Sequence, residues 1–411
     1  MDTMGSSEER LNADVLIVVG DGVDRIDGIA GRVLGCALSS TGLRVALVEE
    51  APSDNTDDGV MTVTSANRPM LETLGLWEPL SERAVPIQAL RILERNSRQV
   101  LEYEAQDLGF EPFGWTLSTR HFREVLTSAL RTGEAQVLEG ALRNLSFDDD
   151  TVQGSLSDGR ELTARLVVAD DGALSPIRGM AGVDSTLWDS GQTRIRCLVT
   201  HTESQDGYAY QQFLPGGPFV ILPRTDLQSW IFWTDRHPRA RALMALKDED
   251  YLAELSVRLD GVFGTLTEIG PRVATPVTSR FAGAHATRRL ALVGSSAMQT
   301  HEGLGLGCDH AFRDAAALAE VVTETFHMGL DIGDAAALSR YQRWRRPDAF
   351  TGLVATEVIT RLFSNDFLPL RLGRGFGLAV MARLGPLKKA LLQQATTPGG
   401  TAPRLLRGEA L

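Results

Sequence analysis

Four side chains that can exchange protons lie close together in the sequence near residue 300. They are His301, Glu302, Asp309 and His310, in the stretch VGSSAMQTHEGLGLGCDHAF (293–312). A carboxylate and an imidazole in one pocket of low dielectric constant can have pKa values near neutrality, which suits general acid and base catalysis. The spacing therefore predicts proton-transfer chemistry, unless Asp309 only caps the helix that follows, a common structural use of aspartate.

Glycines 303, 305 and 307 interrupt the same stretch. It follows the apolar run RRLALV and precedes the helical pattern RDAAALAEVV. Because glycine has no Cβ, it allows the backbone to approach a ligand closely. We therefore expect a strand, then a loop against a ligand, then a helix.

The N-terminal region has the pattern of a dinucleotide-binding unit. The run ADVLIVV (13–19) is typical of a buried strand, GRVLGCALSSTG has helical spacing, and LRVALVEE (43–50) is a second strand that ends in acids. A strand, a glycine turn, a helix and a strand ending in an acid indicate a βαβ unit, in which Glu49 would accept hydrogen bonds from an adenosine ribose.

The segments TRIRCLVTHT, YAYQQFLPGGPFVILP and SWIFWTD predict an antiparallel meander. Alternate residues of such strands point to one side, so we expect a large apolar pocket for a bulky organic ligand. Each aromatic residue taken alone is better explained as ordinary core, whereas the residues as a set favour a bulky organic ligand. Phe232 belongs to this aromatic set, and the residues we expect to bind substrate are Phe213, Gly217, Pro218, Phe219, Trp230 and Trp233.

Composition excludes several classes of function. A net charge of -12 over 411 residues argues against broad binding of nucleic acid or anionic lipid. Three scattered cysteines fit neither a disulfide framework nor a zinc site, and we expect no metal. The polar start MDTMGSSEERLNAD is not a signal peptide, and no apolar run is long enough to span a membrane, so we expect a cytoplasmic protein.

The order of these elements resembles the flavoprotein aromatic hydroxylases, in particular the ubiquinone-biosynthesis hydroxylase branch. The markers include DVLIV with GLRVALVE, LETLGLWEPL, LVVADDGALSPIRGMAG, and the helical ending from YQRWRRPDAF to GPLKKALL. The resemblance implies a mixed α/β fold like that of para-hydroxybenzoate hydroxylase. It comprises a Rossmann-like FAD domain (1–84, 110–186 and 286–345), a β-sheet substrate domain (85–109 and 187–285) and C-terminal helices with a tail (346–411).

The expected phosphate-binding turn departs from the pattern of the family. Gly28 and Gly31 match its last two glycines, but about seven extra residues precede Ile26, and three aspartates (21, 24 and 27) lie in or beside the turn. Carboxylates near a pyrophosphate repel it. In the alternative interpretation, Gly20 and Gly22 begin a longer loop that still closes on the phosphates.

Further departures fall on the same ligand. Val60 replaces an arginine of the family, Asp170 is an added acid before the retained Asp171 and Gly172, and Ser295 replaces an aspartate. The glycine loop keeps His301, Gly305 and Gly307, but has Glu302 for proline, Leu306 for glutamine, Asp309 for asparagine and Ala311 for glycine. Losing several contacts of ~1–3 kcal/mol each would weaken FAD binding by several powers of ten, so we expect FAD to be absent.

Three hypotheses follow. In the favoured one, the protein uses no cofactor and catalyses a redox-neutral cyclisation, isomerisation or rearrangement of an apolar natural product in secondary metabolism, through Asp309, His310, Glu302 and His301. In the second, FAD with NAD(P)H as reductant supports hydroxylation of an aromatic or polyketide substrate. Its contacts would include Gly28, Gly31, Glu49, Asp171, Gly172, Ser295, Gly305 and Gly307.

In the third hypothesis the chain is a non-catalytic binding or scaffold protein. In the first two the partner is a small apolar molecule, and none involves nucleic acid or an integral membrane contact. A homodimer or a partner enzyme stays open.

Overall fold

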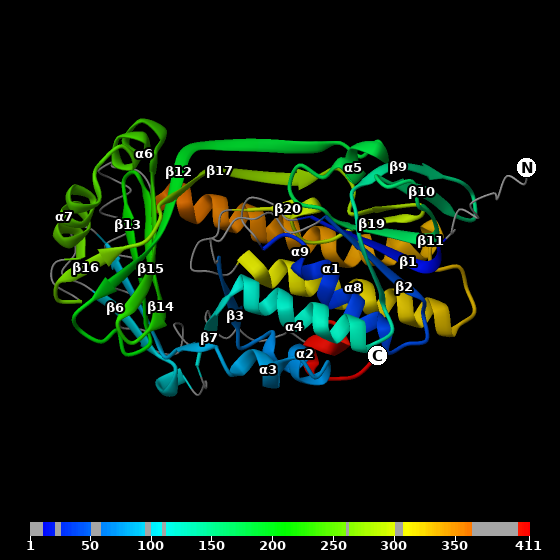
Figure 1. The fold of residues 1–411 in the computed structure, drawn as a ribbon, viewed down its shortest axis with the longest axis horizontal. Coiled ribbons are helices and arrows are strands. Elements are labelled where there is room, and N and C mark those ends of the chain that lie inside the picture. The colour runs from blue at the N-terminus through cyan, green and yellow to red at the C-terminus, as the bar shows by residue number, and fades with distance from the viewer. Residues whose placement is uncertain are drawn as a thin grey trace, which may run out of the picture.

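The computed structural model describes residues 11–20, 26–50, 59–94, 100–108, 112–259, 263–300, 307–363 and 402–411. These residues form two lobes joined by long strands (Figure 1). The elements expected around Asp21, Asp24, His301, Glu302, Gly305 and Leu306, and most of the tail after Phe363, lie outside the described residues.

The first lobe contains a mainly parallel sheet. Its strands, in spatial order, are β18 (Ala286–Thr287), β19 (Leu290–Leu292), β11 (Glu161–Asp170), β1 (Leu11–Val19), β2 (Val45–Glu49) and β8 (Gln136–Glu139). β9 (Leu142–Phe147) and β10 (Val152–Leu156) extend it as an antiparallel ribbon. In β1, Val15 is opposite Val45 of β2 and Leu166 of β11. The β-branched run of β1 is buried on both faces, as in a central parallel strand.

Helices cover one face of this sheet. They are α1 (Ile29–Ser39), α4 (Thr119–Thr132) and α8 (Gly307–His327), and α9 (Ala335–Phe363) packs beside α8 and against β18 (Figure 1). Alternate residues Val15, Ile17 and Val19 of β1 face the helices, whereas Leu16 and Val18 face the core on the other side. α5 (Pro176–Met180) contributes to that second core.

The second lobe is built on a nearly antiparallel sheet. Its strands, in spatial order, are β20 (Met298–Gln299), β17 (Val273–Ala282), β12 (Ser185–His201), β15 (Gln228–Arg236), β14 (Gly217–Thr225), β13 (Tyr208–Leu214), β5 (Ala89–Glu94) and β6 (Val100–Glu104), with β16 (Leu266–Ile269) beside β12. α6 (His237–Met244) and α7 (Asp248–Leu259) cover its outer face (Figure 1).

The long strands β12 and β17 connect the two lobes (Figure 1). A small sheet of β3 (Val60–Thr64), β7 (Gly114–Ser118) and β4 (Val85–Ile87) contacts both α8 and β14. α2 (Arg68–Thr73), α3 (Trp77–Ser81) and three short 3₁₀ turns, η1 (Gln106–Leu108), η2 (Gly294–Ser296) and η3 (Arg404–Arg407), complete the described elements. The predicted fold class is confirmed.

None of the helices in the described ranges has a segment both long and apolar enough to cross a membrane. In the same ranges no group of three or more His, Cys, Asp or Glu side chains is placed to hold a metal ion.

Candidate functional site

The carboxyl ends of four parallel strands meet at one edge of the first sheet. Glu49 ends β2 and Asp170 ends β11, while Gly20 follows β1 and Gly294 follows β19. In open α/β sheets this edge is where ligands bind. This edge therefore brings together several residues that the sequence predicted to contact FAD: those of the glycine turn, Glu49, Asp171, Gly172 and Ser295.

The described residues on the two sides of the insertion, Gly20 and Gly28, lie close together. The N–H of Gly20 donates to the carbonyl of Asp170 (3.1 Å), so the chain is still fixed to the sheet directly after β1. A Cβ on Gly28 would lie 2.9 Å from the carbonyl oxygen of Gly20, and the φ of Gly28 is 80°. Gly20 and Gly28 therefore lie next to each other, and α1 starts beside β1 despite the insertion between them.

Gly31 lets α1 pack directly on β1. A Cβ at this position would lie 2.8 Å from Cγ1 of Val19 and 3.0 Å from Cγ2 of Ile17. This close helix–strand packing is the function of the last glycine in a dinucleotide-binding turn. The backbone N–H of Gly31 also donates to Oδ2 of Asp170 at 2.7 Å.

Two arginines, Arg32 and Arg123, bring positive charge to the start of α1, and the sequence analysis did not identify either. The buried Arg32 pairs with Glu49 (2.5 Å) and donates to the carbonyl of Gly28 (3.0 Å). From α4, Arg123 donates to the carbonyl of Asp27 (3.0 Å). They bring positive charge close to Asp27, whereas Asp21 and Asp24 lie outside the described residues.

The added acid Asp170 is fully buried, and burial raises its pKa well above the ordinary value, with the charge of Asp27 acting in the same direction. Burial thus favours its uncharged form, which repels an anion less than a carboxylate does. Asp171 instead accepts hydrogen bonds from Ser175 (2.6 Å) and from the N–H of Ile177 (3.0 Å). Its carboxylate thus caps α5, so the structure gives it a local structural role. Gly172, at φ 90°, lies against Asp27.

Asp309 and His310 do not form an acid–base pair. Asp309 lies in the first turn of α8 and accepts hydrogen bonds from Thr64 (2.9 Å) and Asn67 (2.5 Å). His310 faces α9, because a Cβ on Gly352 would lie 2.6 Å from its ring. Burial raises the pKa of Asp309 to about 6 and lowers the pKa of His310 to about 4. Asp309 therefore neither forms the N-cap nor meets His310.

A buried ion pair between α8 and α9 is a further feature that the sequence did not indicate. Asp314 of α8 pairs with Arg345 of α9 at 2.7 Å and accepts from the N–H of Gly294 at 3.2 Å. It connects both helices to the turn that carries the half-buried Ser295. The pair holds the glycine turn after β19 against α8.

A small apolar pocket lies where the two lobes meet. It encloses about 20 Å³, within a hollow of about 360 Å³ that includes the part open to solvent. Its lining comes from the first turn, β3, β14, β15 and the start of α8: Ile26, Val60, Met61, Thr62, Val220, Leu222, Phe232 and Cys308. This position, beside the dinucleotide edge and under the second sheet, suits an organic substrate.

The alternation of strands β14 and β15 corrects part of the predicted substrate set. Phe219 and Trp233 point to the outer core with α6 and α7, whereas Val220 and Phe232 point to the pocket. Neighbouring residues of a strand face opposite sides, and the sequence does not reveal which side is which. Gly217, Pro218 and Phe213 lie at the end of the β13–β14 hairpin and do not line the pocket.

Trp230 lines a larger and more polar cavity of about 610 Å³. Arg83, Arg120, His121 and Arg224 also line it, and Val60 lines both cavities. Val60 therefore stands between an apolar pocket and a charged one.

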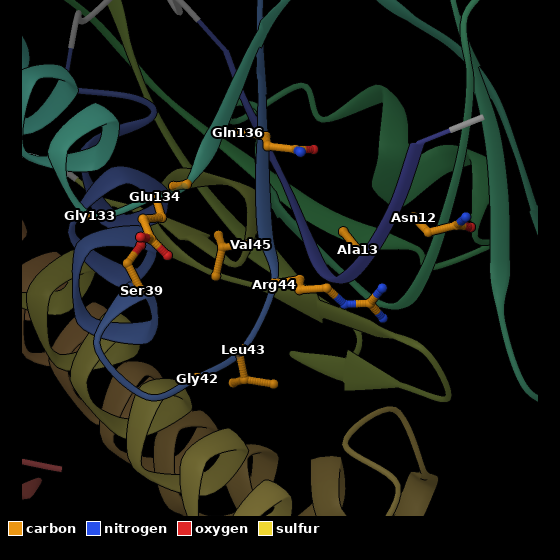
Figure 2. Close-up of a pocket in the computed structure, with 11 residues that line it drawn as sticks. Asn12, Ala13, Ser39, Gly42, Leu43, Arg44, Val45, Gly133, Glu134 and Gln136 are labelled. Atoms are coloured by element: carbon orange, nitrogen blue, oxygen red, sulfur yellow. The ribbon is translucent and has the colours of Figure 1, made fainter. Parts of the chain in front are cut away.

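A third pocket lies at the opposite edge of the first sheet (Figure 2). It has a volume of about 200 Å³ and is formed by the starts of β1, β2 and β8, with Arg44, Glu134 and Gln136 among its residues. Because it lies at the amino ends of the parallel strands, it is not the dinucleotide crevice.

Comparisons with known proteins support the FAD-binding hypothesis. Residues 12–351 match the family described as FAD binding domain. The chain is 37% identical to the ubiquinone hydroxylase UbiL of Rhodospirillum rubrum, with 96% of this chain and 93% of that protein covered. It is 28% identical to the 3-demethoxyubiquinol 3-hydroxylase of Escherichia coli, with 90% and 96% covered.

Among solved structures, p-nitrophenol 4-monooxygenase PnpA from Pseudomonas putida matches with a TM-score of 0.77 at 18% identity, covering 94% of this chain and 98% of that one. The Diels-Alderase PyrE3 matches with a TM-score of 0.71 at 16% identity, covering 97% and 81%. The fold alone thus does not decide between oxygenation and a redox-neutral reaction.

The favoured hypothesis of a cofactor-free cyclase or isomerase is wrong, because the relatives with similar sequences are named as hydroxylases. The expectation that FAD is absent, with a vestigial site, is likewise unsupported, since the chain matches an FAD-binding family over most of its length. The physical reason lies beside the turn: Gly20 and Gly28 approach each other, and Arg32 and Arg123 bring positive charge to the start of α1.

Proposed function

We propose, because this chain belongs to the FAD-binding family of flavoprotein aromatic hydroxylases, that it is an FAD-dependent monooxygenase that hydroxylates an aromatic ring. The reductant would be NAD(P)H.

The strand–turn–helix at the start of the chain carries this proposal. A Cβ at Gly28 would lie 2.5 Å from Nη1 of Arg32, and one at Gly31 would lie 2.8 Å from Cγ1 of Val19, so only bare backbone fits at the N-terminus of α1. An anionic pyrophosphate is stabilised by such a helix end. Glu49 lies at the end of β2, where an acid accepts hydrogen bonds from an adenosine ribose. The residues therefore fit FAD.

FAD, when bound and reduced, supplies the activation of O₂ for insertion of one oxygen atom into the ring, with the second oxygen leaving as water. The protein groups would position the reactants. Gly28, Gly31 and Glu49 would hold the dinucleotide, and Ser295 and Gly307 lie where the family places contacts to the flavin half. Asp309 would fix the first turn of α8 to Thr64 and Asn67 beside the apolar pocket.

We propose a phenol or quinol with an apolar substituent as the substrate class. The relatives are named for ubiquinone or demethoxyubiquinol, and these molecules carry oxygenated rings with isoprenoid tails. The pocket beside α8 is lined almost entirely by aliphatic and aromatic side chains. Such a lining favours an uncharged ring.

The test combines spectroscopy and isotope labelling. We expect the purified protein, or the protein reconstituted with FAD, to show a bound-flavin absorption spectrum and to release FAD on denaturation. With NADH or NADPH, ¹⁸O₂ and 2-geranylphenol as the probe, the product should contain one ¹⁸O atom per molecule.

Two results would contradict the proposal. Failure to bind FAD even at high concentration would show that the protein does not use this cofactor. Stoichiometric FAD with no oxygen incorporated into any of a panel of prenylated phenols would instead favour the non-catalytic binding role.

A further inference from the structure

One buried polar group, the hydroxyl of Thr62, stands out in the apolar pocket between the lobes. Thr62 is 5% exposed and lines the pocket. Its Oγ1 is buried and has no hydrogen-bond partner in the described part of the chain. Buried hydroxyls are normally paired, because leaving one unpaired forfeits its bonds to water.

The hydroxyls of two neighbouring threonines have hydrogen-bond partners, so this part of the structure does not generally lack acceptors. Thr64, two residues along β3 on the same face, donates to Asp309 at 2.9 Å. Thr116 on the adjacent strand β7 donates to the carbonyl of Pro223 at 2.5 Å. Thr62 differs from both because its hydroxyl is unpaired and the residue lines the pocket.

The rest of the lining defines what Thr62 can bind. Val60, Val220, Leu222 and Phe232 present only carbon, and none of the described lining residues is lysine, arginine or histidine. A carboxylate or phosphate placed here would have no cation to offset its lost hydration. A hydroxyl both donates and accepts, so its natural partner is the neutral oxygen of a phenol or quinol.

The space matches this partner. The enclosed volume of about 20 Å³ accommodates one water-sized group, such as the oxygen of a substrate, and the surrounding hollow of about 360 Å³ is partly open to solvent. Ile26 of the dinucleotide turn and Cys308 of α8 border the same hollow. A ring held by Thr62 would therefore lie next to the cofactor edge.

We propose that Thr62 binds the ring oxygen of a phenolic or quinolic substrate, and that this hydrogen bond selects oxygenated rings and orients them. The inference rests on the proposed function and deepens it, because it names the residue that recognises the substrate. The absence of cations among the described lining residues favours neutral rings over aromatic carboxylates.

The test compares 2-geranylphenol with geranylbenzene, which lacks only the hydroxyl. Equilibrium binding is measured without reductant, by the change in flavin absorbance of the FAD-loaded protein. We expect the wild-type protein to bind the phenol about tenfold more tightly than the hydrocarbon. In Thr62→Val, which keeps the shape but removes the hydroxyl, the ratio should fall to about one. Thr62→Ser should restore it.

Thr323→Val is the matched control. Thr323 is also buried with an unpaired Oγ1 in the described chain, but it lies in α8, fifteen residues beyond Cys308 and about 22 Å along the helix. The same chemical change there should leave the binding ratio unaltered. FAD affinity should stay within about twofold in all three variants, because Thr62 is assigned to the substrate and not to the cofactor.

The proposal is overturned if Thr62→Val keeps the preference for the phenol, or if it loses FAD while keeping that preference. The wild-type comparison decides independently of how the variants fold, since equal affinity for the two probes also overturns it. If the wild-type protein incorporates ¹⁸O but binds the two probes equally, the proposed function stands and only the role of Thr62 is rejected. If it holds no FAD, quenching of tryptophan fluorescence still gives the ratio, and the failure belongs to the proposed function.

Discussion

Asp309 and His310 are adjacent in the sequence, yet their side chains serve different interfaces. Successive residues of a helix are rotated by about 100°, so Asp309 reaches Thr64 and Asn67 while His310 packs against Gly352 of α9. The sequence identified both as chemically capable groups. It could not show that they diverge, because α8 begins at Gly307, two residues before Asp309, and the start of a helix is poorly defined by pattern.

The first prediction concerns Asp309→Asn. Burial raises the pKa of Asp309 from 3.8 to about 6, so its contribution to stability is fully present below about pH 4 and is lost as the pH rises through about 6. Asparagine keeps an oxygen acceptor for Thr64 and Asn67 without the charge. At pH 7.5 the variant should therefore gain about 1–3 kcal/mol in free energy of unfolding.

Chemical denaturation at pH 7.5 and pH 4.5 measures this gain, which should shrink at the lower pH. Asp150→Asn removes one charge from an exposed loop and serves as the control, with no expected change at either pH. A variant that is less stable than wild type at pH 7.5 would mean that the ionised carboxylate is needed.

At the scale of elements, the strand–turn–helix shows what spacing alone can and cannot predict. The pattern placed Gly28 and Gly31 correctly at the start of α1, and Glu49 at the end of β2. From the sequence we expected the insertion to disrupt the turn, because the spacing does not show that Gly20 and Gly28 approach each other. That contact depends on how the chain folds back, which no local pattern encodes.

The second prediction is that Gly31→Ala weakens FAD binding at least tenfold. Its Cβ would lie 2.8 Å from Val19 and 3.0 Å from Ile17, so α1 must move away from β1 and carry the turn with it. Overpacking of this kind costs about 1–3 kcal/mol in stability. Titration of the apoprotein with FAD, followed by flavin fluorescence, measures the affinity.

Gly179→Ala is the control, because a Cβ at Gly179 would meet nothing within 4 Å. It should bind FAD as wild type does. Unchanged affinity in Gly31→Ala would contradict the role we give to the close packing of α1 on β1.

The sheets of the second lobe show a different limit. Aromatic and β-branched composition predicted the meander, and β12 to β17 lie within the expected region. Which side chains of β14 and β15 point to the outer core and which to the pocket could not be predicted, since both faces of these strands carry large apolar residues. One face packs under α6 and α7 and the other meets the first lobe, so hydrophobicity alone does not distinguish core from pocket.

At the scale of the whole molecule, the site lies at the junction of the two lobes. β12 and β17 run from one lobe to the other, and the pocket takes its lining from both (Figure 1). The order of elements along the chain predicted the two kinds of sheet. The contact between them comes from tertiary packing, which brings Phe232 of β15 near Cys308 of α8.

The third prediction follows from this arrangement and concerns removal of the cofactor. A ligand that binds only the folded protein stabilises it by RT ln(1 + [L]/Kd), about 2.7 kcal/mol at one hundred times Kd. FAD should therefore raise the thermal unfolding midpoint of the apoprotein. Riboflavin at the same concentration should raise it much less, because riboflavin lacks the pyrophosphate and ribose that we propose Gly28, Gly31 and Glu49 hold. Differential scanning fluorimetry compares the two ligands, with Gly31→Ala as the control in which the advantage of FAD should diminish. Equal shifts with both flavins would show that the turn after β1 contributes nothing to binding.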